Sequence, residues 1–419
     1  MTPEAVFAQL AHRPGAVWLD GGRAATGWSI LAWEPTDVFT GGEGWPEAGR
    51  ERVVPPSDSS LAPFVGGCLG YIGFGAGHHV EVVPAQEPTV EPEVWLGRYR
   101  GGLCYRHRDQ TWHAGGPADF RADAHEVLAA AHALPVPPPP PPGPEPRTTP
   151  KAQYLAAIET VLEHIRSGDC YQVNLSRPVF IDDVGDPWLA YRRLRALSAP
   201  GFGAYMRIDP HTAILSNSPE LFLQVDGAHA LSEPVKGTRP RDADLAHDHR
   251  LAEALRASPK DRAELTMIVD LVRNDLGKVA VAGSVHTKER TVRAHAHVHH
   301  AAQAISATLN QGLDVWDALR AAFPPGSVTG APKIRACERI RELEETPRGL
   351  YCGAIGFASD NGLARWSVAI RTAIWHRNNI RYHVGGGIVA GSTPLDEWAE
   401  TQAKGMALAA ALRTRAPDA

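Results

Sequence analysis

Short apolar runs separated by glycine and proline fill most of the first 133 residues. Examples are "AVWLDGG", "GWSILAWEP", "FVGGCLGYIGF" and "EVWLGRYRGGLCYRH". Runs of this length, bounded by turn residues, are typical of β-strands. Residues 1–133 are therefore predicted to form a strand-rich region with few helices.

Helical spacing of apolar positions marks three segments of the C-terminal part. "KAQYLAAIETVLEHIRSGD" ends its helical pattern at Gly168, and "PKDRAELTMIVDLVRND" and "TPLDEWAETQAKGMALAAALRTR" have the same period. The last begins with Thr393 as N-cap, Pro394 at the first helical position and Asp396 in a capping-box-like pair. "ARWSVAIRTAIWH" and "IRYHVGGGIVAG" are expected to be strands. The fold class is predicted to be α+β with much sheet.

A proline-rich stretch, residues 134–150, separates the two parts. Six consecutive prolines in "LPVPPPPPPGPEPRTTP" cannot join a helix or a sheet interior, so an extended connector is expected. It is either a domain boundary or a long surface loop within one fold. Residues 151–415 form the second part.

Composition limits the classes of partner. The 419 residues are 43% hydrophobic and 21% charged, with a net charge of −5, which does not favour nucleic acid or an anionic membrane as partner. The N-terminus does not have the pattern of a signal peptide, and no apolar run approaches the roughly 20 residues that span a bilayer. Five widely spaced cysteines without a CxxC pair are typical of reduced thiols, so a cytoplasmic location is predicted.

Two of the predicted helices carry carboxylate pairs at helical spacing. Asp261 and Glu264 are three residues apart, as are Glu397 and Glu400. Residues at i and i+3 share a helix face, so each helix can present two carboxylates to one point. Oxygen ligands of this kind suit Mg²⁺. Spacing alone leaves solvated helix faces as the simpler alternative.

Two further patterns suggest chemistry that the sequence does not support. "GGCLGY" resembles the nucleophile turn of glutamine-hydrolysing amidotransferases around Cys68, but the late His-Pro-Glu that such a cysteine needs is missing. "AHAHVHH" places His295, His297 and His299 on one side of a possible strand. Zinc ligation there is less plausible than ordinary exposed or hydrogen-bonded histidines. His300 lies on the other face.

The segment "EPVKGTRPR", residues 233–241, is expected to be a loop, and it holds Lys236 between proline and glycine. With "SGDCYQVNLSRPVF", "SNSPELF", "FPPGSVTGAPKIRACERIRELE" and "GGGIVAGSTPLDEWAETQAK", it resembles the chorismate-utilising enzyme family. The motifs follow the family's order through residues 151–415. The resemblance implies a two-lobed sandwich of large antiparallel sheets with helices outside, of the anthranilate synthase component I type. Residues 151–415 would then be the chorismate-binding catalytic region.

Two positions discriminate between branches of this family. Isochorismate and salicylate synthases have a water-activating lysine where this chain has Gln172, and an amide cannot serve as that base. Anthranilate synthases have alanine at the position of Lys236, whereas the branch that aminates C4 of chorismate, toward p-aminobenzoate and folate, has lysine. The resemblance thus implies amination at C4. The first alternative is anthranilate formation. The second is a non-catalytic subunit that binds chorismate or tryptophan.

The resemblance also assigns roles in catalysis and metal binding. Lys236 matches a nucleophile, for which a lowered pKa is expected from burial and the metal, and Glu220 matches a general acid with a raised pKa. Glu264 and Glu400 match direct Mg²⁺ ligands, with Asp261 and Glu397 acting through water. His300 matches a histidine near the substrate ring.

Substrate contacts and partners follow in the same way. The matching positions are Gly237, Thr238, Tyr351, Arg371, Gly385, Gly386, Gly387 and Lys404. The substrates implied are chorismate and ammonia, the latter from a separate glutamine amidotransferase subunit. Gly391 stands where the family usually has aspartate, and "WLDGG" departs from the Leu-Leu-Glu-Ser pattern of tryptophan-inhibited members.

Overall fold

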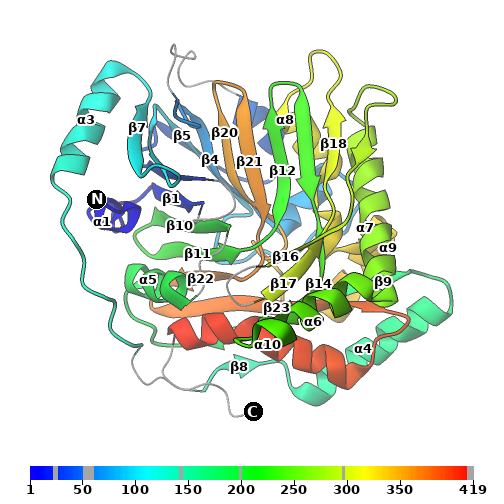
Figure 1. Cartoon of the computed structure of the whole chain (residues 1–419). Coiled ribbons are helices and arrows are strands. Elements are labelled where there is room, and N and C mark those ends of the chain that lie inside the picture. Colours follow the sequence, from blue (N-terminus) through cyan, green and yellow to red (C-terminus); the bar gives the residue numbers. More distant parts are fainter. Residues whose placement is uncertain (22–26, 51–60, 141–144, 198–200, 295–297, 413–419) are drawn as a thin grey trace.

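Two large antiparallel sheets form the frame of the protein. The computed structural model describes residues 1–419 except 22–26, 51–60, 141–144, 198–200, 295–297 and 413–419. Within the described residues, one sheet has 11 strands, a second has nine and a small one has three. Figure 1 shows the strands of the two large sheets crossing, with helices on the outside. The predicted α+β class and sandwich are confirmed.

The strands of each sheet come from distant parts of the chain. The first sheet runs in pairing order β19 (Gly330–Ala331), β9 (Gln172–Ile181), β23 (Asn379–Val389), β22 (Thr372–His376), β11 (Thr212–Ser218), β10 (Phe202–Asp209), β1 (Ala16–Asp20), β2 (Trp28–Ala32), β6 (Gly102–Arg106) and β7 (Thr111–Gly115), with β8 (Arg147–Thr148) beside β9. The second runs β15 (His286–Thr287), β18 (Ile305–Thr308), β13 (His229–Glu233), β12 (Leu221–Asp226), β21 (Leu363–Val368), β20 (Ala354–Ser359), β4 (Gly67–Ile72), β5 (Val94–Tyr99) and β3 (Asp37–Thr40). The third is β14 (Val235–Pro240), β17 (Val298–Ala302) and β16 (Thr291–Ala294).

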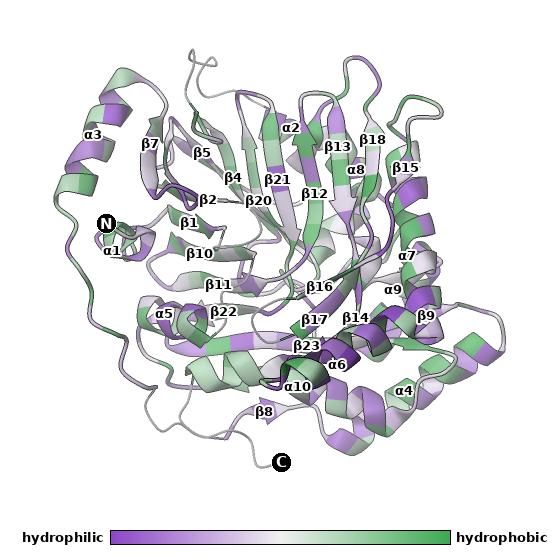
Figure 2. Ribbon diagram, viewed as in Figure 1, coloured by the Kyte–Doolittle hydropathy of each residue, from purple (hydrophilic) through white to green (hydrophobic). Residues whose placement is uncertain are grey.

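Helices cover the outer faces of these sheets. They are α1 (Pro3–Phe7), α2 (Trp45–Arg50), α3 (Ala118–Ala129), α4 (Lys151–Arg166), α5 (Pro187–Leu197), α6 (Leu245–Ala257), α7 (Pro259–Gly277), α8 (Val315–Ala322), α9 (Lys333–Leu343) and α10 (Pro394–Leu412), with 3₁₀ turns η1 (Phe74–His79) and η2 (Gly326–Val328). The predicted cap of α10 is present, because the backbone N–H of Asp396 donates to the Thr393 hydroxyl at 3.4 Å. In Figure 2, α4 and α6 carry many hydrophilic residues, whereas β12 and β18 are largely hydrophobic. None of the helices in the described parts of the chain is long and apolar enough to cross a bilayer.

Alternating side chains on the strands build a separate core on each face of the first sheet. Val17 and Met206 belong to the cluster between the two large sheets, whereas their neighbours Trp18 and Tyr205 belong to the cluster beneath α1 and α5. This alternation follows from the two-residue period of a strand. Both faces of these strands are buried, which explains why their sequences are nearly continuous apolar runs.

The proline-rich segment lies along the outside of α5. Arg192 donates to the Pro135 carbonyl and Arg193 donates to the Pro138 carbonyl at 2.7 Å. Strands before and after this segment pair in the same sheets, since β1 joins β10 and β4 joins β20. Residues 1–133 and the later part of the chain therefore share one framework.

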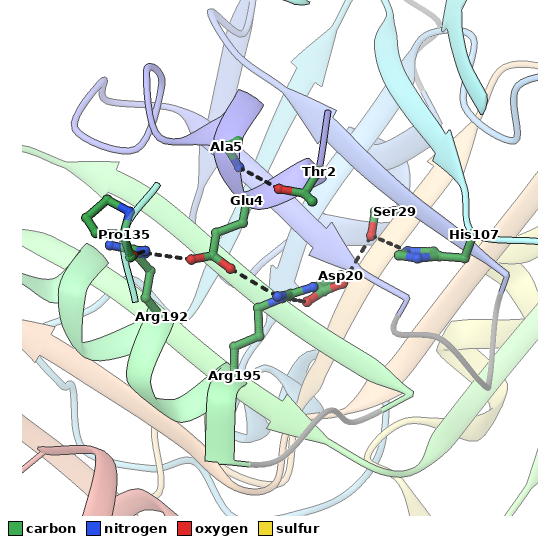
Figure 3. Close-up of polar contacts among 9 residues, drawn as sticks. All are labelled: Thr2, Glu4, Ala5, Asp20, Ser29, His107, Pro135, Arg192 and Arg195. Atoms are coloured by element: carbon green, nitrogen blue, oxygen red, sulfur yellow. Dashed lines mark hydrogen bonds and ion pairs between the residues drawn. The ribbon is translucent and has the colours of Figure 1, made fainter. Parts of the chain in front are cut away.

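Figure 3 shows how the N-terminal helix is tied to this framework. Glu4 accepts from both Arg192 and Arg195 of α5. Arg195 also donates to the buried Asp20 on β1, to which the Ser29 hydroxyl of β2 donates as well. Ion pairs thus link α1, α5 and β1, and the hydrogen bond from Ser29 adds β2.

Candidate active site

The predicted site residues lie where the chain passes between sheets. Glu220 connects β11 of the first sheet with β12 of the second, and Arg371 connects β21 of the second with β22 of the first. Lys236 follows the passage from β13 to β14 of the third sheet. Three chain crossings therefore supply an acid, a guanidinium and an amine.

Lys236 lies in a β-bulge, not in a loop. The prediction of a loop over 233–241 is wrong, because Val235–Pro240 is the edge strand β14. Val235 pairs with Ala302 and Thr238 with His300, so β14 holds one extra residue between these pairs. A bulge redirects side chains, and prolines are tolerated on an edge strand, which explains why the turn-like composition fits a strand here.

Gly237 makes this bulge possible. Its φ of +82° is in the region that favours glycine, and an added Cβ would lie 2.8 Å from Asp261 Oδ1 and from Leu255 Cδ1. Residue 237 must therefore lack a side chain for β14 to pack against α7.

The amine of Lys236 lies among carboxylates. Its Nζ is 3.0 Å from Glu264 Oε1, and the Lys236 side chain is only 11% exposed. Burial lowers the pKa of Lys236, but Glu264, Glu220 and Glu400 raise it, and the net pKa is above its ordinary value. The lowered pKa expected for Lys236 includes the effect of a bound metal ion, so it stays a prediction; in the metal-free chain the three carboxylates near the amine raise its pKa.

Helices α7 and α10 bring their carboxylates to neighbouring glycines of β23. A Cβ added at Gly386 would lie 2.9 Å from Glu397 Oε2 and 3.6 Å from Glu400 Oε1, and one at Gly387 would lie 2.9 Å from Glu264 Oε1. Glycines at these positions therefore let the acidic side chains approach the strand backbone.

The four predicted metal ligands are paired with cations and a hydroxyl. Glu264 lies beside Lys236, Glu400 lies 2.6 Å from Lys404 Nζ, and Asp261 lies 2.9 Å from an Arg239 nitrogen. Glu397 Oε1 accepts from the Ser392 hydroxyl at 2.5 Å. Among the described residues, no three of the four carboxylates have oxygens within 4.8 Å of one another.

Lys404 connects α10 with the glycine run of β23. Its amine donates to the Gly385 carbonyl at 2.9 Å while it pairs with Glu400. The charge of Lys404 outweighs partial burial, so the pKa of Glu400, whose side chain is 51% exposed, lies below its ordinary value, whereas burial raises the pKa of Glu397. The pKa values of these two carboxyls of α10 are therefore shifted in opposite directions.

Glu220 has the environment of a general acid. It is 4% exposed, and burial raises its pKa, opposed by a hydrogen bond with Ser327 and by the charge of Lys236. Its Oε1 is buried without a hydrogen-bond partner in the described part of the chain. The predicted upward direction of the Glu220 pKa agrees with this environment.

The predicted substrate contacts lie around this centre at different depths. Arg371, with a φ of +51°, is largely buried, and its burial lowers its pKa while Glu220 raises it. Tyr351 is 4% exposed and stacks on His383 at 5.3 Å between ring centroids. Thr238 is exposed on β14, opposite the buried His300 of β17.

Two residues near the site were missed by sequence reasoning. Ser327 on η2 bonds to Glu220, and Arg239 pairs with Asp261. Both residues lie inside motifs that carry the family resemblance, "FPPGSVTGAPK" and "EPVKGTRPR". A serine or an arginine in such a motif does not by itself indicate which carboxylate it will contact. Gln172 donates to Glu264 Oε1 at 3.4 Å, so the amide lies at the carboxylate cluster.

The patterns set aside in the sequence have ordinary structural explanations. Cys68 lies buried on β4, and burial raises its pKa to about 12, which rules out a thiolate nucleophile. The other four cysteines are also buried and free. His299 Nε2 lies 2.8 Å from Asp248, as expected for a hydrogen-bonded histidine, whereas His295 and His297 lie outside the described residues. Gly391 has open space around its Cα.

Known proteins resemble the chain over nearly its whole length. It is 36% identical to aminodeoxychorismate synthase component 1 of Escherichia coli K12, over 95% of this chain and 93% of that protein. It is 41% identical to anthranilate synthase component 1 of Saccharolobus solfataricus, over 84% and 82% of the two chains. The structure of anthranilate synthase component I from Streptococcus pneumoniae TIGR4 superposes with a TM-score of 0.81 at 26% identity, covering 91% and 92%. Residues 25–410 match the family model described as chorismate binding enzyme, and this chain belongs to that family.

Proposed function

We propose that this chain converts chorismate and ammonia to 4-amino-4-deoxychorismate, the reaction expected of an aminodeoxychorismate synthase component 1. The observation that carries the proposal is the amine of Lys236, buried in a bulge 3.0 Å from Glu264 and within the field of Glu220. A nucleophile and an acid are what a two-step substitution needs. The relative from Escherichia coli supports the same assignment.

The first step forms a bond between Lys236 Nζ and C2 of chorismate. The ring double bonds shift, the bond from C4 to its hydroxyl breaks, and Glu220 gives the proton with which the hydroxyl leaves as water. In the second step ammonia bonds to C4, the double bonds shift back and the bond from C2 to the lysine nitrogen breaks. The ammonium group formed at C4 then gives up one proton, which restores the acid form of Glu220, so the sum is chorismate and ammonia to aminodeoxychorismate and water.

The acidic cluster fits a divalent cation of the Mg²⁺ type. Glu397 Oε2 is a buried carboxylate oxygen without a hydrogen-bond partner among the described residues, and it lies beside Gly386. Oxygen ligands of this kind suit Mg²⁺. Glu264 and Glu400 would hold the ion, with Asp261 and Glu397 nearby, and the ion would supply Lewis-acid stabilisation of the ring carboxylate.

The amine must be neutral to attack, and its pairing with Glu264 opposes this. A carboxylate that held a cation would no longer stabilise the charged lysine, so a metal ion bound at the cluster would lower the pKa of Lys236. Burial of the amine then acts in the same direction. We therefore expect nucleophile activation to depend on the divalent ion.

Substrate positioning is assigned to the groups around the cluster. Arg371 can bind a carboxylate bidentately, Tyr351 can donate a hydroxyl hydrogen bond, and Lys404 adds positive charge. The backbone of Gly385, Gly386 and Gly387 leaves room for a close approach, as does Gly237 with Thr238. His300 would lie beside the ring.

Ammonia is proposed to come from a separate glutamine amidotransferase subunit. All five cysteines of this chain are buried, so none offers the accessible thiolate that glutamine hydrolysis by cysteine chemistry requires. The cytoplasmic location remains a prediction.

Product identity tests the proposal. Purified protein incubated with chorismate, ammonium and Mg²⁺ should yield aminodeoxychorismate by mass and no fluorescent anthranilate. The competing function, anthranilate formation, is favoured by the 41% identity to the Saccharolobus solfataricus protein. Anthranilate with release of pyruvate, in the absence of any lyase, would establish that function instead. Binding of chorismate without turnover at high ammonium would establish a non-catalytic subunit.

A further inference from the structure

Three side chains with metal-binding atoms meet at the end of η1. His78 and His79 end η1, and Glu93 immediately precedes β5. In the described parts of the chain, this is the one group of at least three His, Cys, Asp or Glu side chains whose ligand atoms all lie within 4.8 Å of one another. None of the three takes part in the proposed reaction.

The distances between these atoms suit a single ion. His79 Nε2 is 3.0 Å from Glu93 Oε2, and His78 Nδ1 is 3.7 Å from Glu93 Oε1. Two ligands of one zinc ion, each about 2.0–2.2 Å from it, lie roughly 3–3.5 Å apart. The Gly75 carbonyl lies 2.7 Å from His78 Nδ1 and is its hydrogen-bond partner in the metal-free chain.

Two glycines pack closely against this group of donors. A Cβ at Gly42 would lie 1.9 Å from Glu93 Oε2 and 2.1 Å from His79 Nε2, and a Cβ at Gly75 would lie 2.7 Å from Glu93 Oε1. Side chains at either position would press on the ligand atoms. The side chains of His78, His79 and Glu93 are 29%, 21% and 30% exposed, so an ion can reach them from solvent.

We propose that His78, His79 and Glu93 bind one transition-metal cation of the Zn²⁺ class. Two imidazoles and one carboxylate are the ligands that zinc prefers over Mg²⁺, which takes oxygen ligands alone. On binding, the proton of His78 moves from Nδ1 to Nε2, the hydrogen bond to the Gly75 carbonyl is lost, and the Nδ1 lone pair coordinates the ion; the His79 proton moves in the same way from Nε2 to Nδ1. The hydrogen bond between His79 and Glu93 is replaced by two bonds to the metal.

This ion would brace two segments that lead into the active site. The backbone N–H of Phe74 donates to the Gly349 carbonyl at 2.8 Å, two residues before Tyr351. Gly77 packs closely on Pro324, since a Cβ at Gly77 would lie 3.1 Å from Pro324 Cδ, and this proline precedes η2. A metal that joins η1 to β5 therefore stabilises the support of η2 and of Tyr351.

Zinc titration of the full chain tests the proposal. Metal-free protein is titrated with Zn²⁺ by calorimetry in excess Mg²⁺, which keeps the carboxylate cluster occupied by the harder ion. We expect one Zn²⁺ per chain, a rise in the melting temperature, and binding weakened at least about tenfold in His79→Gln and Glu93→Gln. His12→Gln, which changes an exposed histidine outside the group, should bind Zn²⁺ as the unchanged chain does.

Co²⁺ provides a measurement on the unchanged chain. The ligand-field spectrum of bound Co²⁺ should show nitrogen ligation, and added Zn²⁺ should abolish it. Melting of the metal-free variants shows whether they fold. Zinc affinity equal in the unchanged chain, His79→Gln and Glu93→Gln would overturn the proposal, as would no zinc binding at all. Zinc binding lost in Glu264→Gln but kept in His79→Gln would also overturn it, by moving the ion to the carboxylate cluster.

Discussion

At Lys236, one side chain is subject to two opposing effects. Burial disfavours the charged amine, whereas the carboxylate of Glu264, 3.0 Å away, favours it, and together with Glu220 and Glu400 it outweighs burial. The same pairing places the amine at a fixed point beside β23. The carboxylate that positions the lysine is therefore also the group whose charge must be neutralised before the lysine can attack.

Replacing Lys236 by methionine tests the covalent role. Lys236→Met keeps the length of the side chain but removes the nucleophile, so kcat should fall on the order of a thousandfold or more while chorismate still binds. Steady-state rates and equilibrium binding of chorismate measure the two effects. Lys288→Met, an exposed lysine elsewhere, provides the matched control. A kcat within a few-fold of the unchanged enzyme would remove Lys236 from the mechanism.

The raised pKa of Glu220 predicts how the rate depends on pH. Its raised pKa keeps the carboxyl protonated to higher pH than an ordinary glutamate, so the rate should fall as pH rises through that pKa. Glu220→Gln cannot give the proton, and kcat should drop by about 10²–10⁴-fold with loss of that limb of the pH profile. Glu159→Gln, on the exposed face of α4, is the control. If the rate of Glu220→Gln still falls at high pH in the same way, that fall reports the titration of a different residue, and the role given to Glu220 is wrong.

At the scale of elements, the bulge in β14 determines where the amine points. The extra residue between the Val235 and Thr238 pairs requires Gly237 at a φ of +82°, in contact with α7. Edge strand, bulge and helix therefore form one unit, and its geometry depends on a single missing side chain.

Gly237→Ala should disturb that unit. A β-carbon there adds backbone strain of about 1–3 kcal/mol and meets Asp261 and Leu255, so both the melting temperature and kcat should decrease. Gly391→Ala is the matched control, because nothing lies within 4 Å of its added Cβ and its φ is not positive. Thermal melting and turnover of both variants make the comparison. Equal effects of the two substitutions would contradict the importance of the bulge.

Local signals predicted some elements of this fold and failed for others. The helices α4, α7 and α10 have long apolar periods, α4 ends just before Gly168 and α10 has the Thr393 cap, so their positions followed from sequence. The strand β14 was mistaken for a loop, because proline and glycine carry the same local signal at a turn and on a bulged edge strand. "ARWSVAIRTAIWH" is divided into two strands in different sheets at Arg371, a change of direction that no local pattern marks.

At the scale of the whole molecule, the site depends on pairings between distant segments. The roles of single residues could be inferred from motif resemblance, but their partners could not, because Gln172 and Glu264 or Lys404 and Gly385 meet only through sheet order. The N-terminal strands are part of this order, since β1 and β2 extend the first sheet and β4 and β5 the second. The catalytic residues therefore rest on a framework built by the entire chain.

The source of nitrogen is the prediction that belongs to the whole molecule. Burial raises the pKa values of Cys68, Cys104, Cys337 and Cys352 to about 12, and Cys170 is buried too, so no thiolate is available to attack glutamine. The isolated chain should therefore use ammonium but not glutamine. Rates with each nitrogen source, before and after a glutamine amidotransferase subunit is added, measure this directly. Because ammonia rather than ammonium ion is the nucleophile, the ammonium-dependent rate should also rise with pH until Glu220 loses its proton. Glutamine-dependent amination by the chain alone would contradict this prediction. It would show that the chain releases ammonia from glutamine without using its buried cysteines.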